Sequence, residues 1–209
     1  MTDNVTPLFG RTMSHQRMAE AAFDQVIIEG DERGDDPDRL PIRVTRLEMR
    51  RRPSRPVAAP ANQRLGLLRL REVPVPFYRF LFFGVGEAHH WRLPSRQTDE
   101  MLHSELNGPG REVHVLYVGG APAGFFELDV ANAREAVAIN CFGILPHARG
   151  RGLARWLLHE AVGAAWAHDP PRLRIQTNSL DSPIALRLYQ AAGFAVTHQS
   201  DGWLVLRES

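Results

Sequence analysis

The sequence predicts an α/β domain built on a mixed β-sheet, and three observations lead to this class. Residues 111–130 hold two runs rich in Val, Tyr and Phe on either side of Gly119-Gly120, which is typical of a β-hairpin. Residues 152–167 place apolar side chains on one helix face. A strand pattern at 172–178 follows, and such alternation of strand and helix favours a sheet with both parallel and antiparallel pairs.

Ahead of the hairpin, the pattern predicts two strands and a pair of helices. Residues 42–50 alternate apolar and polar side chains with one slip in register, as in a half-buried strand, and residues 65–71 form a second short strand. Residues 74–86 have apolar side chains at helical spacing. The capping signal Thr98-Asp99 opens another helix at 98–106, and we expect these two helices to pack together.

After the hairpin, the remaining elements complete the sheet. A strand is predicted at 136–144. Ser182 as N-cap and Gly193 as C-terminal stop predict a helix over 183–192. The chain is then predicted to close as a hairpin turned at Asp201-Gly202.

Length and composition indicate one globular domain with a lead-in. The 209 residues are 44% apolar and 23% charged, which is ordinary for a folded domain. We expect the domain to cover residues 41–209. Residues 1–40 show no sustained period and carry six acidic residues within 29–38, so they are expected to be a flexible or loosely packed lead-in.

Charge gives no general attraction to nucleic acid or anionic lipid, because 25 basic residues nearly cancel 24 acidic ones. The run from Arg43 to Arg55 holds six arginines, and a nucleic-acid contact there remains one hypothesis. A solvated face is favoured, since the run lacks interleaved aromatic residues. Residues 73–86 are too short to span a bilayer, so no membrane partner is expected.

Cysteine and histidine usage point away from disulfides and metals. Cys141 is the one cysteine, which excludes an internal disulfide and, without a signal peptide, favours a cytoplasmic protein. We interpret Cys141 as a small core residue rather than a nucleophile. The nine histidines lack the spacing of zinc ligands, so no metal is expected.

A glycine loop between a strand and a helix has the chemistry of an anion site. The strand ends at Ile144, and Arg149-Gly150-Arg151-Gly152 then leads at once into the helix. Helix N-termini present free N–H groups and a partial positive charge, and glycines allow an anion to come close. This loop is therefore suited to a pyrophosphate, although an ordinary strand-to-helix turn has the same pattern.

Together with a second motif, this loop resembles the GNAT superfamily of acyl-CoA-dependent N-acyltransferases. The two motifs are ILPHARGRGLA at residues 144–154 and ALRLYQAAGF at 185–194. The resemblance covers roughly residues 42–207 and implies a twisted mixed sheet, with helices on both faces, splayed between its fourth and fifth strands. Acetyl-CoA is expected to lie in the splay.

The resemblance also implies a set of cofactor-binding residues. The backbone of Ile144 is expected to bond the pantetheine arm. Asn178 and Ser182 are expected to line the far side. The pyrophosphate is expected to be held by the N–H groups of Arg149, Gly150, Arg151, Gly152, Leu153 and Ala154.

Catalysis requires a base for the amine and an acid for the CoA thiolate. Many superfamily members carry a Glu six residues before the position of Ile144, but Ala138 stands there. Glu127 is our choice of base because its apolar neighbours favour burial and a raised pKa, although the side chain on solvent is the alternative. Asp129 and Glu135 are other candidates. Tyr189 matches the family's tyrosine acid.

These features predict an N-acetyltransferase that moves an acetyl group from acetyl-CoA directly to an amine in a ternary complex. The alternative is a non-catalytic acyl-CoA-binding module, which the absence of Glu at Ala138 keeps open. His90 and Trp91 are candidate contacts for a small-molecule or peptide amine acceptor of unknown identity. The sequence also leaves a homodimer open.

Overall fold

One sheet of eight strands organises the part of the chain that the computed structural model describes, residues 27–29, 39–93 and 97–205. In spatial order the strands run β1-β8-β2-β7-β6-β5-β4-β3. Their bounds are β1 Ile27–Glu29, β2 Arg39–Met49, β3 Leu65–Arg69, β4 Arg111–Val118, β5 Ala121–Asp129, β6 Val137–Ile144, β7 Leu173–Asn178 and β8 Ala195–Val205. The pairing of β6 with β7 is parallel, and every other neighbouring pair is antiparallel.

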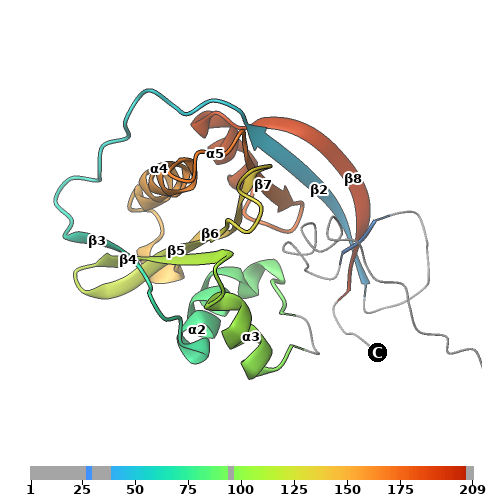
Figure 1. Ribbon diagram of the computed structural model, residues 1–209, viewed down its shortest axis with the longest axis horizontal. Coiled ribbons are helices and arrows are strands. Elements are labelled where there is room, and N and C mark those ends of the chain that lie inside the picture. Colours follow the sequence, from blue (N-terminus) through green and yellow to red (C-terminus); the bar gives the residue numbers. More distant parts are fainter. Residues whose placement is uncertain (1–26, 30–38, 94–96, 206–209) are drawn as a thin grey trace, which may run out of the picture.

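Helices cover both faces of this sheet, as predicted. Helices α4 and α5 lie on one side and α2 and α3 on the other (Figure 1). The described helices are α2 Val75–Gly86, α3 Asp99–Leu106, α4 Leu153–Trp166 and α5 Ala185–Ala192, with short 3-10 turns η2 Glu87–His89 and η3 Pro146–Ala148. Each face has its own buried cluster, one containing Leu157 of α4 and the other Leu81 of α2.

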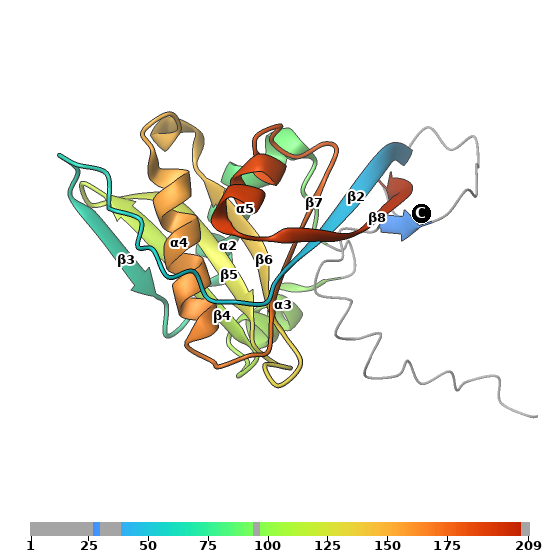
Figure 2. The same ribbon diagram turned by 90° about the horizontal axis from the view of Figure 1, so that it is seen from above.

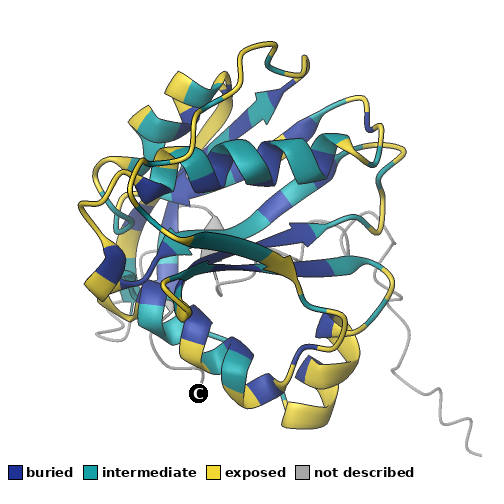
Figure 3. Ribbon diagram, turned by 90° about the vertical axis from the view of Figure 1, so that its left-hand side faces the viewer, coloured by how far each residue is buried: buried dark blue, intermediate teal, exposed yellow. Residues whose placement is uncertain are grey.

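Buried side chains follow the helix faces that meet the sheet (Figure 3). On α2 the buried face carries Tyr78, Leu81, Phe82 and Val85, whereas Phe80 is 52% exposed. The predicted cap of α3 is confirmed, because the Thr98 side chain accepts a hydrogen bond from Met101 N at 3.2 Å. This bond satisfies one of the free N–H groups of the helix's first turn.

Strand β2 is inserted between β7 and β8, with a ladder to each. The slip expected in this strand is confirmed, because Ile42 and Val44 are buried in one cluster whereas Leu47 and Met49 are buried in another. Val44 and Leu47 lie on opposite faces of the strand, so the buried face changes between them. The shift of the β8 register between Arg46 and Leu47 leaves Thr197 of β8 as the extra residue. Figure 2 shows β2 and β8 running together past the end of α5.

Two predicted boundaries in the C-terminal part are wrong. Asp201-Gly202 forms no hairpin, because β8 continues through these residues to Val205. Strand β2 pairs with β8 along this length, from Glu48↔Ala195 to Arg39↔Val205. A long partner strand outweighs a local turn signal. Helix α5 begins at Ala185 rather than at residue 183, with no side-chain cap from Ser182.

The predicted lead-in, residues 1–40, lies mostly outside the described residues. Within it, Ile27–Glu29 pairs with β8 and β2 begins at Arg39. Arginines of the run after residue 42 meet acidic partners, with Arg43 Nε 2.8 Å from Asp201 Oδ1 and Arg50 Nη2 2.8 Å from Glu48 Oε2. No described helix has the length and apolar character needed to cross a bilayer.

Candidate functional site

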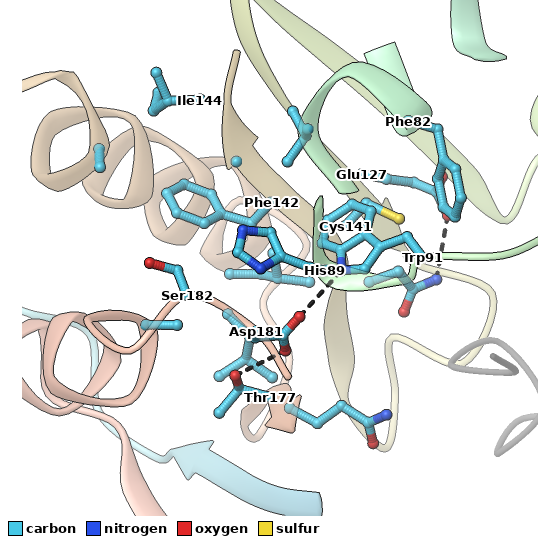
Figure 4. A pocket seen from close by; sticks show the side chains of 18 of the residues that line it. Phe82, His89, Trp91, Glu127, Cys141, Phe142, Ile144, Thr177, Asp181 and Ser182 are labelled. Atoms are coloured by element: carbon cyan, nitrogen blue, oxygen red, sulfur yellow. Dashed lines mark hydrogen bonds between the residues drawn. The ribbon is translucent and has the colours of Figure 1, made fainter. Parts of the chain in front are cut away.

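A cleft of about 820 Å³ opens where β6 and β7 separate (Figure 4). The two strands pair from Val137↔Leu173 to Ile139↔Ile175 and no further. Counted from β3, they are the fourth and fifth strands, so the predicted splay is confirmed. The cleft is lined by residues from β5, β6, β7, α2, α3, α4 and α5.

The separation begins at a bulge in β6. Glu127 of β5 pairs with Cys141 and Leu128 pairs with Ile139, so Asn140 is the extra residue between them. A bulge bends its strand and redirects the side chains that follow. It therefore turns the end of β6 away from β7 and presents Asn140 and Cys141 to the cleft.

The glycine loop forms one wall of the cleft and leads into α4. Gly150 and Gly152 both have φ of +74°, a left-handed conformation that favours glycine, and a Cβ built on Gly150 meets nothing within 4 Å. Gly152 is the N-cap of α4, and Leu153 and Ala154 begin its first turn. The first N–H groups of a helix have no partner within the helix, and the space beside Gly150 leaves room for a diphosphate to approach them.

Arg149 ties this loop to its surroundings. Its guanidinium donates to Ile144 O at 3.1 Å and to Val85 O at 3.2 Å. Leu145 N donates to Ala123 O of β5, and since the two groups of one trans peptide point in opposite directions, Ile144 O faces away from β5. Arg151 is exposed, and neither it nor His90 lines the cleft.

Tyr189 reaches the cleft from α5 and is 6% exposed. Its ring packs edge-on to Phe142 of β6 and to Phe194. Burial raises the pKa of the Tyr189 hydroxyl, and the nearby Asp181 and Cys141 raise it further. The hydroxyl therefore keeps its proton at neutral pH, and it has no hydrogen-bond partner within the described ranges.

Glu127 lies at the inner end of the cleft, 4% exposed, so its side chain is not on solvent. Tyr78 Oη donates to Oε2 at 2.7 Å, and Arg111 Nη1 donates to Oε1 at 3.0 Å. Asn140 Nδ2 also donates to Oε1, at 3.3 Å. Burial raises the pKa of Glu127 above its ordinary value, while Arg111 and Tyr78 oppose that shift.

The other carboxylates near Glu127 have different places. Asp129 Oδ2 lies 3.6 Å from Arg111 Nη1, outside the cleft lining. Glu135 is exposed in the turn after β5. Ala138 pairs with Asp129 and Arg174 and also lies outside the lining, so this side of β6 offers no base to the cleft.

Two hydrogen bonds join the turn after α2 to the β7–α5 loop across the cleft. Trp91 Nε1 donates to Asp181 Oδ1 at 3.0 Å (Figure 4). His89 Nδ1 lies 3.0 Å from Leu180 O. Asp181 is in turn held by Thr177 Oγ1 at 2.8 Å. Of the predicted acceptor residues, Trp91 lines the cleft, and His89 does so in place of His90.

Asn178 and Ser182 line the same cleft from the β7 side. The end of β6 and the start of α4 line it with Ile144, Gly150, Gly152, Leu153 and Ala154. Sequence reasoning missed Tyr78, Arg111, Asn140 and Asp181. Asn140 is a lone amide inside an apolar strand and was the one readable signal. Arg111 reaches the cleft through strand pairing, Tyr78 through the packing of α2 on the sheet, and Asp181 through the loop after β7, and all three placements depend on the tertiary fold.

Cys141 differs from its expected role as a core residue, because it is half-buried and lines the cleft. Its Sγ lies 3.9 Å from Tyr78 Oη, and burial raises the pKa of the thiol, which keeps it protonated. Within the described ranges, no three His, Cys, Asp or Glu side chains gather as metal ligands.

Comparison with known proteins finds the sequence profile of the acetyltransferase (GNAT) family at residues 67–194. A comparison with curated proteins finds no match. Solved structures do match. A putative GNAT acetyltransferase from Novosphingobium aromaticivorans has a TM-score of 0.56 at 15% identity, over 83% of this chain and 69% of that one.

Two further structures have a similar fold. A GCN5-related N-acetyltransferase from Sphaerobacter thermophilus has a TM-score of 0.53 at 21% identity, over 80% of this chain and 53% of that one. A spermidine N-acetyltransferase from Vibrio cholerae, in complex with CoA and spermine, has a TM-score of 0.51 at 18% identity, over 66% of this chain and 92% of that one.

Proposed function

The chain belongs to the GNAT acetyltransferase family, and from that premise we propose that it transfers an acetyl group from acetyl-CoA directly to an amine in a ternary complex. One observation carries the proposal: the glycine loop, Tyr189 and Glu127 come from separate elements and open on one cleft. An acyl carrier held at the loop reaches a proton donor and a proton acceptor in the same space.

The loop supports the carrier through backbone geometry. Left-handed Gly150 and Gly152 leave the first N–H groups of α4 uncovered, and the helix end adds partial positive charge. Arg155 also lines the cleft and adds a full charge. These groups fit a diphosphate, and the splayed end of β6 offers backbone groups of Ile144 to the pantetheine arm.

Glu127 fits the base because an alkyl ammonium of pKa about 10.4 is deprotonated to only roughly one part in a few thousand at pH 7. The amine gives a proton to Glu127, its nitrogen bonds the thioester carbon, and the C–S bond breaks. Tyr78 and Arg111 hold the carboxylate in one orientation. Burial moves its pKa toward neutrality, which makes it a better acceptor of that proton.

Tyr189 fits the acid that protonates the leaving thiolate. Its raised pKa keeps the hydroxyl protonated until charge develops on sulfur. No other described group accepts a hydrogen bond from this hydroxyl. On becoming an amide the ammonium loses two protons, the first to Glu127 and the second to solvent. Tyr189 gives its proton to sulfur and recovers one from solvent, and Glu127 releases its proton to solvent, so each turnover releases one proton.

Amines are the acceptors named for similar folds. The Vibrio cholerae structure holds spermine, and an aminoglycoside acetyltransferase from a soil metagenome, with a TM-score of 0.51 at 16% identity, covers 62% of this chain. The alternative function is acyl-CoA binding without catalysis, and Ala138 at the position of the family's usual base favours it.

The carrier site is tested by thermal unfolding with acetyl-CoA. Ligand at 100 times its Kd adds about 2.7 kcal/mol to the free energy of unfolding. We expect this gain for the parent and for Gly163→Glu, a control in the last turn of α4 where an added Cβ meets nothing within 4 Å. Gly150→Glu places a carboxylate at the loop and should abolish the gain, and equal affinity in Gly150→Glu overturns the carrier site.

Release of free thiol on adding amines separates the two functions. An acetyltransferase releases one thiol for each amide formed. A binding module is stabilised by acetyl-CoA but releases no thiol when amines are added. That result would favour acyl-CoA binding without catalysis over the proposed activity.

A further inference from the structure

The cleft has an arm between α2, α3 and the bulge of β6, and the side chains that line this arm indicate which class of acceptor amine it can bind. This inference rests on the proposed function, since an acetyl group must be delivered to the arm. Apolar side chains form most of its wall, with Glu127 at its inner end (Figure 4). The wall residues are Tyr78, Phe82, Trp91, Leu93, Leu102 and Leu106.

Aromatic rings dominate one side of this arm. Phe82 has its centroid 5.3 Å from that of Trp91 and 5.8 Å from that of Tyr78. The bond from Trp91 to Asp181 fixes the indole across the opening. Gly86 lies under the same ring, because a Cβ there would be 2.2 Å from Trp91 Cγ. A preformed aromatic wall favours a flat or apolar body over a sugar or a polyamine.

The charged groups of the arm are already committed to one another. Arg111 binds Glu127, Asp129 and Glu105, so its charge is not available to a carboxylate on the acceptor. Asp181 is occupied by Trp91 and Thr177. Arg92 also lines the cleft but is exposed to water. The one positive charge of Arg111 faces three carboxylates, so the cluster favours an ammonium at Glu127 and disfavours a carboxylate on the acceptor. A second ammonium on the same acceptor would lie against the apolar wall, where burying a charge without a partner is costly.

Asn140 adds a hydrogen-bond acceptor without a donor beside Glu127. A carboxylate only accepts, so Asn140 must turn its Nδ2 toward Glu127, which leaves Oδ1 without that partner. Asn140 Oδ1 is buried and has no partner within the described ranges. Gln97 repeats the arrangement, with Nε2 on Glu105 at 2.8 Å and a buried, unpaired Oε1.

Both unpaired buried side-chain atoms in the described lining are therefore amide oxygens. A buried acceptor without a partner costs free energy, and a ligand that brings an N–H group recovers it. We propose that the arm takes a primary amine with one positive charge on an apolar or aromatic body, and that Asn140 Oδ1 receives the N–H of that amine beside the Glu127 carboxylate.

Two matched pairs of amines test the acceptor class by thiol release from acetyl-CoA. Phenethylamine and phenylalanine differ by a carboxylate, and hexylamine and 1,6-diaminohexane differ by a second ammonium. We expect kcat/KM to be at least about tenfold higher for the first member of each pair, a difference of about 1.4 kcal/mol. Equal or reversed preference in either pair overturns the proposed class.

Variants test the role of Asn140. Asn140→Ala should raise KM for phenethylamine about tenfold, the effect of losing one buried hydrogen bond of about 1.4 kcal/mol, with the acetyl-CoA thermal gain unchanged. Asn132→Ala, the same change in an exposed turn, should alter neither. If Asn140 acted only by positioning Glu127, kcat and the pH profile would change while KM stayed constant, and that outcome overturns amine binding by Asn140.

The failures are distinguishable. If acetyl-CoA stabilises the chain and the diamine or the amino acid is the preferred acceptor, the acceptor class is wrong and the acetyltransferase stands. If none of the four amines releases thiol but spermine or an aminoglycoside does, the acceptor class is wrong and the acetyltransferase stands; if none of these amines releases thiol, the proposed activity falls as well.

Discussion

Glu127 is a single carboxylate on which burial and ion pairing act in opposite directions. Arg111 and Tyr78 favour its charged form, yet the loss of water around a 4% exposed side chain is the larger effect, and the pKa rises. The fold thus keeps a carboxylate that gains a proton more readily than one on the surface. Such a group costs stability when charged, which is typical of a functional position.

The prediction at Glu127 concerns both activity and stability. Because the pKa of Glu127 is raised in the folded state, the folded protein holds this proton more tightly than the unfolded chain. The resulting contribution to the free energy of unfolding is complete below the ordinary pKa of 4.5 and is lost as pH rises through the folded-state pKa. Glu127→Gln does not titrate. Its melting temperature relative to the parent should therefore increase as pH rises from about 4 to 8, while turnover falls about 10²-fold or more.

The measurements are thermal unfolding across that pH range and thiol release at neutral pH. A melting difference that stays constant or shrinks with rising pH would show that pairing with Arg111 outweighs burial. Full turnover in Glu127→Gln would remove Glu127 as the base.

Tyr189 gives the second prediction at this scale. Tyr189→Phe removes one hydroxyl from a buried ring and leaves its packing on Phe142 intact. We expect kcat to fall about 10²-fold, in the range of general acid catalysis, while affinity for CoA changes little. Tyr117→Phe is the control, since Tyr117 is half-buried on β4 outside the cleft lining. Unchanged kcat in Tyr189→Phe would exclude the hydroxyl from the reaction.

At the scale of elements, the close approach of α2 to β6 shapes the cleft. Gly143 of β6 lies under Val85, and a Cβ on Gly143 would be 2.1 Å from Val85 Cγ1. Gly143→Ala should push α2 outward and cost about 1–3 kcal/mol. Gly66→Ala on β3, where the nearest atom is 4.0 Å away, should change stability by less than about 0.5 kcal/mol.

A double-mutant cycle identifies the contact. Val85→Ala removes the methyl groups that Gly143→Ala would strike, so the pair of changes should destabilise less than the sum of the two, by 0.5 kcal/mol or more, about the smallest coupling expected of residues in contact. Strictly additive free energies from denaturant unfolding would show that the two elements are not in the contact described.

The elements also show what the sequence can and cannot predict. The Gly119-Gly120 hairpin is confirmed, with both glycines at positive φ, because a turn is encoded by its own residues. The Asp201-Gly202 hairpin is wrong, because β2 lies some 150 residues earlier and holds those residues in a strand. The site divides in the same way, since the glycine loop is local, whereas the Tyr78–Glu127–Arg111 cluster depends on the register of β4 with β5 and on the packing of α2 against the sheet.

At the scale of the whole molecule, β2 connects the sheet. It lies before the residues that match the family profile, yet it pairs with β7 on one side and with β8 on the other. Without it, the described part of β8 would have only the three-residue β1 as a partner. Leu47 of β2 is 1% exposed and belongs to the same buried cluster as Leu153 at the start of α4 and Tyr189.

Leu47→Ala should therefore unfold the domain as one unit. Removing a buried Leu side chain costs about 2–5 kcal/mol, and in a chain of this length each kcal/mol lowers Tm by about 2–4 °C. Circular dichroism and tryptophan fluorescence should report one coincident transition at lower temperature. Leu68→Ala, at a 57% exposed position on β3, should leave Tm nearly unchanged. A separate early transition in Leu47→Ala would mean that β2 detaches by itself, and the cleft would then rest on β6, β7 and their helices alone.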